Sequence, residues 1–436
     1  MESFNVELEA RIKRKAVKIG IVGLGYVGLP LAMQFVRAGF TVLGLDIDKD
    51  RIGRIHKKES YITDVSTKEL RSAVSSGKFS ATGEFKALKS CSVVSICVPT
   101  PLKGKYLPNI SYIQHAVKLI AGHIRKGTLI ILESTTYPGT TEEVILPLFE
   151  SYNLKHGRDF YLCYSPERVD PGNKHYPINK IPKVIGGLTP EATRLAAAVY
   201  SRVVVKVVPV SSARVAEAVK LLENTFRLVN IGLIDEMAMM AHKMKMDIWE
   251  IVDAAKTKPF GFMPFYPGPG VGGHCIPKDP LYLYWKAKHF GFRSRFIKLA
   301  SDMINSMPGY VVSRVEEMLK RNKKKLKGSK VLVVGVTYKK DIKDLRKSPA
   351  IDVIEDLRKK GAKVSYLDPL IPYLNLRHVD LHSINPTAEA CKRFDCAVIA
   401  TDHSAVDYKF LLKNCALIFD ARNIYKGAGC RKVDKL

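Results

Sequence analysis

The strand-like run Val17–Val22 leads directly into the glycine-rich segment Gly23–Gly28, and a helix-like stretch follows as far as Arg37. A second strand-like run, Thr41–Asp46, comes next. Glycines at this spacing let the chain turn tightly out of a strand and let the next helix pack close to it. Two strands separated by a helix pair in parallel, with the helix crossing one face of the sheet. The chain is therefore expected to begin as an α/β fold.

The same alternation continues and later restarts. Further strands are predicted at Ser92–Val98, Thr128–Glu133 and Lys183–Ile185. After the basic run Lys320–Lys330, which is interpreted as a linker, a second series of strands is predicted at 331–334, 363–367, 396–400 and 416–419. Two such series indicate an α/β protein with two Rossmann-like, doubly wound domains.

One long helix is predicted over residues 212–245, a stretch that contains no proline. Apolar residues recur there in steps of three and four, at Val215, Val219, Leu222, Phe226, Val229, Leu233, Met237 and Met240. Such a helix would be about 50 Å long. We expect it to connect the two domains and to form the spine of a homodimer or a higher homo-oligomer.

The net charge of +28 raises the question of nucleic-acid binding. The basic residues are spread along the chain, and no zinc finger or helix-turn-helix accompanies them. A positive field that attracts small anions is therefore the favoured interpretation, with no nucleic-acid partner. A basic nucleic-acid-binding protein remains the non-enzymatic alternative.

No membrane span is expected, because no run of eighteen uncharged apolar residues occurs. Residues 1–15 lack a signal-like apolar core and are predicted to form a short amphipathic helix. Eight scattered cysteines without a CxxC pair predict free thiols and a cytoplasmic location, and no metal site. Cys91, Cys97 and Cys396 lie in apolar runs and are expected to be small core residues.

The first glycine turn is typical of a dinucleotide site. Glycines allow the backbone to approach a pyrophosphate at the helix N-terminus, and the candidate contacts are Gly23, Gly25, Tyr26, Val27 and Gly28. Asp46 closes the next strand and would accept hydrogen bonds from ribose hydroxyls, which favours NAD over NADP. Arg51 lies nearby and keeps NADP open as an alternative.

Two threonines follow neighbouring strands. Thr100 and Thr135 come just after the strands at 92–98 and 128–133, where ligands of open sheets bind. Hydroxyls at these positions would hold a cofactor or cap a helix, and for Thr135 the two interpretations are equally good.

The segment 265–280 contains four glycines and four prolines and predicts a shaped loop around Cys275. The glycines before Cys275 are expected to leave room for a substrate at the sulfur. His274 and Lys278 would favour the thiolate, and Asp279 would orient water or take a proton. Cys275 is thus a candidate nucleophile; the alternatives are a metal ligand or an inert buried thiol.

A polar stripe is expected along the long helix, formed by Glu217, Lys220, Asn224 and Arg227. Lys220 and Asn224, one turn apart, would jointly stabilise an oxyanion. The alternative is a solvated helix face.

Taken together, these motifs resemble the nucleotide-sugar 6-dehydrogenase family, which includes the UDP-glucose and GDP-mannose dehydrogenases. The resemblance extends over nearly the whole chain and rests on 23–28 (GLGYVG), 98–101 (VPTP), 164–168 (YSPER), 220–224 (KLLEN), 273–279 (GHCIPKD), 339–341 (KKD) and 346–349 (RKSP). Within the family, 133–141 (ESTTYPGTT) and 258–275 (KPFGFMPFYPGPGVGGHC) resemble the UDP-N-acetylglucosamine 6-dehydrogenase branch.

The resemblance implies a role for each matching position. Cys275 would be the nucleophile, Lys220 and Asn224 the pair that stabilises oxyanions and orients the substrate. Glu167 and Asp279 would handle water and protons, and Thr135 would lie beside the reacting carbon. NAD contacts would come from Asp46, Arg51, Thr100, Thr135, Lys278 and Arg346. Further contacts to the nucleotide sugar would come from Glu167, Phe265, Tyr266, Gly268, Gly272 and Lys339.

The resemblance also implies three domains: an NAD-binding domain over 1–208, a central helical dimerisation domain over 209–320, and a UDP-sugar-binding domain over 321–436. The implied reaction is a two-step oxidation of UDP-N-acetylglucosamine at C6, through a Cys275 thiohemiacetal and thioester, for glycan precursor synthesis. The same chemistry on UDP-glucose, UDP-GalNAc or UDP-ManNAc is an alternative, and a one-step 3-hydroxyacid dehydrogenase is a more distant one. Many relatives insert an arginine into a neighbouring subunit's sugar site, but this chain has no arginine between Thr257 and Cys275, consistent with a different sugar.

Overall fold

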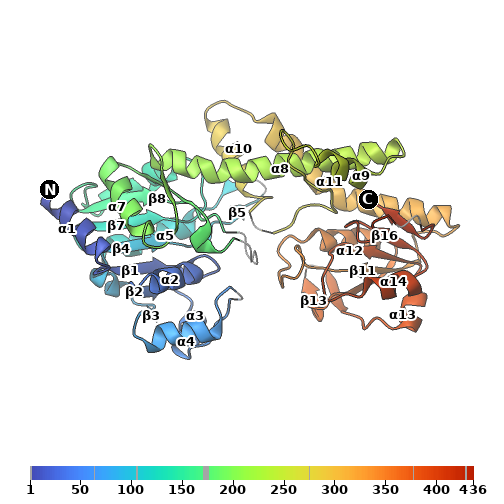
Figure 1. The fold of residues 1–436 in the computed structure, drawn as a ribbon, viewed down its shortest axis with the longest axis horizontal. Helices are drawn as coiled ribbons and strands as arrows, with labels where there is room; N and C mark the ends of the chain where they lie inside the picture. Colours follow the sequence, from blue (N-terminus) through green and yellow to red (C-terminus); the bar gives the residue numbers. More distant parts are fainter. Residues whose placement is uncertain are drawn as a thin grey trace. The chain divides into compact units, whose positions relative to one another are not determined.

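The structure is a computed structural model that describes residues 2–62, 64–104, 107–169, 176–273, 275–376, 378–427 and 430–436. The chain divides into two compact units (Figure 1). The first unit comprises Met1–Glu223 with Trp285–Phe292, and the second comprises Asn224–Tyr284 with Arg293–Leu436.

The described part of the first unit contains an eight-stranded sheet with the order β10-β9-β8-β7-β4-β1-β2-β3. Its strands are β1 (Lys18–Val22), β2 (Thr41–Leu45), β3 (Phe79–Thr82), β4 (Val93–Ile96), β7 (Thr128–Leu132), β8 (Phe160–Tyr164), β9 (Lys183–Gly187) and β10 (Val207–Pro209). Neighbouring strands of this sheet run parallel, except that β8 and β9 run antiparallel. A short hairpin, β5 (Leu102–Lys103) with β6 (Leu107–Pro108), follows β4.

Helices cover both faces of this sheet because its central strands are apolar on both sides. One core packs against α1 (Glu2–Lys13), α2 (Gly28–Arg37), α4 (Thr67–Ser75) and α7 (Pro190–Tyr200). The other packs against α5 (Ser111–Ala121) and α6 (Leu146–Glu150). Consecutive residues of one strand divide between the two cores: Ile21 belongs to the first and Val22 to the second. Helix α3 (Lys49–His56) follows β2 and contributes Ile55 to the first core.

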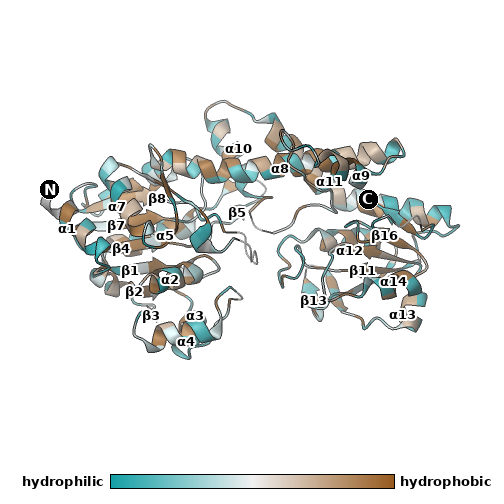
Figure 2. Cartoon of the chain, in the orientation of Figure 1, coloured by the Kyte–Doolittle hydropathy of each residue, from teal (hydrophilic) through white to brown (hydrophobic). Residues whose placement is uncertain are grey.

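The second unit contains a five-stranded parallel sheet with the order β12-β11-β15-β16-β17. These strands are β11 (Lys330–Val334), β12 (Lys363–Leu367), β15 (Cys396–Ile399), β16 (Ile418–Asp420) and β17 (Val433–Lys435). Around them lie α12 (Pro349–Lys359), α13 (Ala388–Lys392), α14 (Tyr408–Asn414) and the hairpin β13 (Tyr373–Leu376) with β14 (Val379–His382). The central strands of both sheets are rich in hydrophobic residues, and so are parts of the helices, among them α2 and α5 (Figure 2).

Among the described residues between the two series of strands lie four helices: α8 (Ala213–Lys243), α9 (Ile248–Ala255), α10 (Asp279–His289) and α11 (Arg295–Arg321). The predicted long helix is confirmed as α8. Its apolar stripe is not buried within one chain, since Leu222, Phe226 and Leu233 expose 65%, 47% and 54% of their surfaces.

The predicted fold class, two Rossmann-like α/β series with a long central helix, is confirmed, and so is the N-terminal helix, now α1. Cys91, Cys97 and Cys396 are buried as expected. Strands β3, β8 and β10 of the first sheet were missed, as was β17 of the second. The basic run Lys320–Lys330, predicted to be a linker, packs in part within the second unit. Helix α11 extends to Arg321, Leu326 is buried, and Lys324 forms an ion pair with Asp395. Among the described helices, none combines the length and apolarity needed to cross a membrane.

The close approach of β1 and α2 gives a direct test of the first glycine turn. A Cβ on Gly28 would lie 1.8 Å from the carbonyl oxygen of Gly23, whereas a Cβ on Gly53 in α3 would meet nothing within 4 Å. We expect Gly28→Ala to destabilise the first unit by about 2 kcal/mol or more, because backbone must move. The matched control Gly53→Ala should be neutral or stabilise by up to about 1 kcal/mol. Thermal unfolding followed by circular dichroism measures both, and equal midpoints would contradict this packing.

Candidate active site

The glycine turn of the first unit is tied to the end of β2. Gly23 has a φ of +92°, and the next amide, Leu24 N, donates to Asp46 Oδ2 at 2.7 Å. The same carboxylate oxygen accepts from Arg51 Nη1 at 3.1 Å, and Asp46 Oδ1 accepts from Asp48 N at 3.0 Å. The structure therefore brings Asp46 and Arg51 together beside the turn. Gly25 and Tyr26 belong to this turn, Val27 precedes the first residue of α2, and Tyr26 is 58% exposed.

The two threonines at the strand ends also lie together, because β4 and β7 are neighbours in the sheet. Thr100 is buried, and its hydroxyl donates to the carbonyl of Thr135 at 2.7 Å. Thr100 thus holds the turn after β7, and a cofactor contact from either hydroxyl stays a prediction.

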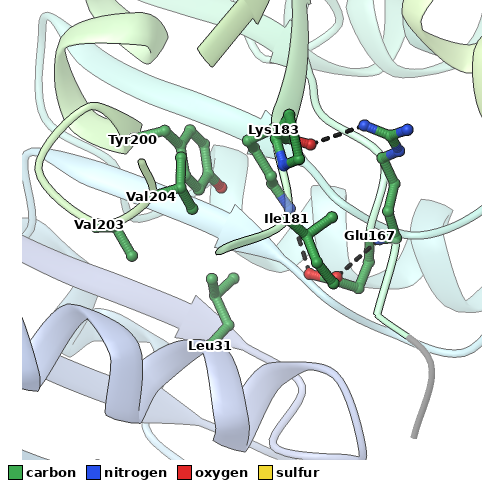
Figure 3. A pocket seen from close by; sticks show the side chains of 9 residues that line it. Leu31, Glu167, Ile181, Lys183, Tyr200, Val203 and Val204 are labelled. Atoms are coloured by element: carbon green, nitrogen blue, oxygen red, sulfur yellow. Dashed lines mark hydrogen bonds and ion pairs between the residues drawn. The ribbon is translucent and has the colours of Figure 1, made fainter. Parts of the chain in front are cut away.

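A buried charge cluster lies beyond the ends of β7 and β8. Lys183 Nζ lies 2.5 Å from Glu133 Oε2 and 3.3 Å from Glu167 Oε2. Glu167 Oε1 accepts from the amides of Arg168 and Val169 at 2.7 and 2.9 Å. Figure 3 shows Lys183 and Glu167 side by side on the wall of a small pocket. Of these residues only Glu167 was predicted; Glu133 and Lys183 were not assigned a role.

Burial and charge oppose each other in this cluster. Burial raises the pKa of Glu133 to about 7, although Lys183 counteracts it. Burial also acts to raise the pKa of Glu167, but Lys183, the amide of Val169 and the more distant Lys220 outweigh it and hold that pKa below its ordinary value. Glu167 is thereby favoured as an ionised carboxylate.

The predicted polar stripe of α8 is mostly buried, so the solvated-face interpretation is wrong for three of its four members. Glu217, Lys220 and Asn224 expose 0%, 8% and 5%, and only Arg227 is exposed. The Glu217 carboxylate accepts hydrogen bonds from Gly139 N, Thr141 N and the Thr141 hydroxyl at 2.5–2.9 Å. It therefore orders the loop after β7.

In the second unit, Cys275 lies at the turn that leads into α10. Its carbonyl oxygen accepts from the amides of Lys278 and Asp279 at 3.1 and 2.8 Å. Asn224 Nδ2 donates to Asp279 Oδ2 at 2.7 Å. Cys275 is exposed, whereas Lys278 and Asp279 are buried. The structure thus gathers four of the predicted residues, although His274 lies outside the described residues.

Lys278 is suited to act near a thiolate. Burial lowers its pKa to about 8, against the opposing effects of Asp279 and Cys275. Its ammonium lies 3.9 Å from Asp279 Oδ1. Between pH 7 and 8, Lys278 can therefore hold or release a proton.

The glycines before Cys275 do not leave open space, which corrects the expectation from the sequence. A Cβ on Gly272 would lie 2.5 Å from Tyr338 Cβ and 2.6 Å from the carbonyl oxygen of Lys347. Gly273 has a φ of +82°, and its amide donates to the carbonyl of Arg346 at 2.8 Å. These glycines let the loop pack against the turn that follows β11.

The predicted sugar-contact residues of this loop have protein partners. Phe265 packs edge-on against Phe226 of α8, and Tyr266 stacks on Trp249 of α9. Gly268 N donates to Asp235 Oδ1 at 3.1 Å, and burial raises the pKa of Asp235 to about 8. Asp235 was not predicted from the sequence.

Of the remaining predicted residues, Lys339 lies on the turn after β11, where its carbonyl accepts from Thr337. Arg346 forms a bidentate pair with Asp344. Substrate and cofactor contacts from these two side chains stay predictions.

Three domains of one known enzyme family match most of this chain. The NAD binding domain, the central domain and the UDP binding domain of the UDP-glucose/GDP-mannose dehydrogenases match residues 17–204, 214–306 and 332–427. The chain belongs to the UDP-glucose/GDP-mannose dehydrogenase family. It is therefore an NAD-dependent oxidoreductase, and the predicted family resemblance is confirmed.

Individual relatives differ in their sugar. The chain is 36% identical to the UDP-N-acetyl-D-glucosamine 6-dehydrogenase of Pseudomonas aeruginosa, over 89% of this chain and 91% of the relative. It is equally 36% identical to the UDP-N-acetyl-D-mannosamine dehydrogenase of Pyrococcus horikoshii, over 94% and 96%. The solved structure of a UDP-D-ManNAc dehydrogenase from Pyrococcus horikoshii has a TM-score of 0.87, with 34% identity over 96% of this chain and 98% of that one. A 3-hydroxyisobutyrate dehydrogenase from Mycobacterium tuberculosis, 18% identical with a TM-score of 0.51, shares only the fold.

The exposure of the thiols predicts selective alkylation. Six cysteines are buried, and burial raises the pKa of Cys91, Cys97, Cys163, Cys391, Cys396 and Cys415. In the native protein at pH 7.5 we expect iodoacetamide to label Cys275 at least about tenfold faster than any buried thiol. Peptide mapping by mass spectrometry measures the order of labelling. The rapid labelling of Cys275 should be absent in Cys275→Ala and unchanged in Cys430→Ala, and labelling of a buried cysteine as fast as Cys275 would contradict the prediction.

Proposed function

We propose that this protein oxidises UDP-N-acetylglucosamine at C6 to the uronic acid, in two successive oxidations at one thiol. The observation that carries the proposal is the cluster around Cys275: an exposed thiol in a turn with a buried lysine of lowered pKa, and an Asn224–Asp279 hydrogen bond alongside. A single oxidation of an alcohol needs no nucleophile, whereas an aldehyde that must be oxidised again benefits from covalent capture.

NAD⁺, when bound, accepts the hydride in each of the two oxidations. The first oxidation gives the C6 aldehyde, and Glu167, Lys220 or water takes the hydroxyl proton. The Cys275 thiolate adds to the aldehyde carbon and forms a thiohemiacetal, which the second oxidation converts to a thioester. Lys220 and Asn224 stabilise the oxyanions. Water, deprotonated by Glu167 or Asp279, then displaces the thiolate and yields the carboxylate.

A second substrate, UDP-N-acetylmannosamine, is favoured by the equal identity to the Pyrococcus horikoshii enzyme and by the similarity of its solved structure. The proposal includes a homodimer, supported by the apolar stripe that α8 leaves exposed in one chain.

The sugar is tested by initial rates of NADH formation with UDP-N-acetylglucosamine, UDP-N-acetylmannosamine, UDP-N-acetylgalactosamine and UDP-glucose. We expect the highest kcat/KM with UDP-N-acetylglucosamine, and mass spectrometry should identify the uronic acid as the product. A higher kcat/KM with UDP-N-acetylmannosamine would move the assignment to the second substrate. Absence of turnover with all four would overturn the proposal.

The cofactor preference is proposed to depend on Asp46, which would bond to the ribose hydroxyls. Asp46→Ala should weaken NAD binding about tenfold and narrow the gap between NAD and NADP, because one charge-assisted hydrogen bond is lost. Asp368→Ala is the matched control, since Asp368 bonds to Val336 N in the second unit as Asp46 bonds to Leu24 N. Calorimetric titration with both cofactors measures the effect. An unchanged NAD/NADP ratio in Asp46→Ala would place Asp46 away from the ribose.

A further inference from the structure

We propose that Lys183 is a positioning residue, which holds Glu167 as an oriented carboxylate that activates water for release of the acid from Cys275. The inference rests on the proposed function and adds Lys183, with its partner Glu133, to the machinery of the hydrolytic step.

Strand direction explains how Lys183 reaches this position. In a parallel sheet, the first residue of one strand lies at the opposite edge from the last residues of its neighbours. β9 runs antiparallel to β8, pairing Cys163 with Gly187 and Tyr164 with Gly186. Continuing this register by three residues places Lys183 across from Glu167. The first residue of β9 thus lies at the edge where β7 and β8 end.

The contacts leave Glu167 little freedom. One carboxylate oxygen accepts from two consecutive backbone amides, and the other faces the Lys183 ammonium at 3.3 Å. The side chain of Glu167 keeps 15% of its surface exposed, which leaves a route for water. A carboxylate held at both oxygens yet partly exposed is suited to orient one water molecule.

The Lys183 ammonium is itself fixed by a second carboxylate. Glu133 is completely buried, lies 2.5 Å from Lys183 Nζ, and receives a hydrogen bond from the Tyr200 hydroxyl. The centre of the Tyr200 ring lies 5.1 Å from the ammonium nitrogen. Figure 3 shows both side chains in the pocket. Apolar residues, Leu31, Val203 and Val204, line the pocket beside them. In such surroundings a buried charge is tolerated only with a partner, so Glu133 anchors the ammonium that Glu167 needs.

The other charged and titratable groups around Glu167 strengthen this assignment. Arg168, next in sequence, directs its guanidinium to Glu223 and to the carbonyl of Pro182 at 2.6 and 2.8 Å. Lys220 of α8 lowers the pKa of Glu167 by its charge, without a hydrogen bond to it. Cys97 is a buried thiol, and its pKa is raised by burial and by the negative charges of Glu133 and Glu167. Lys183 is therefore the cation in direct contact with Glu167 within the described part of the first unit.

The test is the pH dependence of kcat for the best UDP-sugar at saturating NAD. In the wild-type protein, protonation of Glu167 should produce the acidic limb, which Glu167→Gln should abolish together with most of the turnover. In Lys183→Met the limb should move to higher pH by at least about one unit, because the cation that favours the ionised form is gone. KM for the sugar should change less than about threefold.

Two further variants separate positioning from stability. Glu133→Gln/Lys183→Met removes both buried charges, so it should fold even if Lys183→Met does not, and should show the same upward movement. In Glu133→Gln alone, Lys183 keeps Glu167 as its one carboxylate partner. The acidic limb of the kcat profile in this variant should therefore stay in place or move to lower pH. A wild-type limb that persists in Glu167→Gln, or one that does not move in either variant lacking Lys183, would overturn the inference. Neither result would affect the proposed function, which fails only if the wild-type protein forms no uronic acid.

Discussion

Each of the two sheets contains the same kind of hydrogen bond. In each, the amide after the glycine that follows the first strand donates to a carboxylate at the end of the next strand. Leu24 N donates to Asp46 and Val336 N donates to Asp368, each at 2.7 Å. This bond ties the C-terminal ends of two neighbouring parallel strands together, at the edge of the sheet where the glycine turn lies. The polar neighbours of the two carboxylates differ: the first lies beside a half-exposed arginine, whereas the second lies against a buried histidine. The two turns therefore differ in the charge and exposure of the group beside the carboxylate.

Two buried lysines, Lys278 and Lys183, illustrate how burial and charge together set protonation. Burial is the larger effect at Lys278, so its pKa falls to about 8, whereas two carboxylates outweigh burial at Lys183 and raise its pKa. One lysine can thus exchange a proton near neutral pH, and the other remains a fixed positive charge. This contrast suits a thiol-activating group and a positioning group, respectively.

Local patterns were sufficient to predict most strands, the glycine turns and the Cys275 loop, because strand and turn propensities depend on nearby residues. They were not sufficient for β8, although its five residues are all buried, as are those of the predicted strand β7. The Asn224–Asp279 contact joins residues 55 apart, and Lys183 reaches Glu167 only because β9 is antiparallel. Strand direction and long-range contacts are set by the packing of the whole domain, so no local pattern reveals them.

The central claim is that one thiol holds the sugar between two oxidations. The most direct measurement is the number of NADH molecules formed per UDP-sugar consumed, from absorbance and product quantification in the same reaction. The account predicts two NADH per sugar, with the uronic acid as the product and no free aldehyde accumulating. One NADH per sugar, with the aldehyde or ketone as the final product, would contradict it.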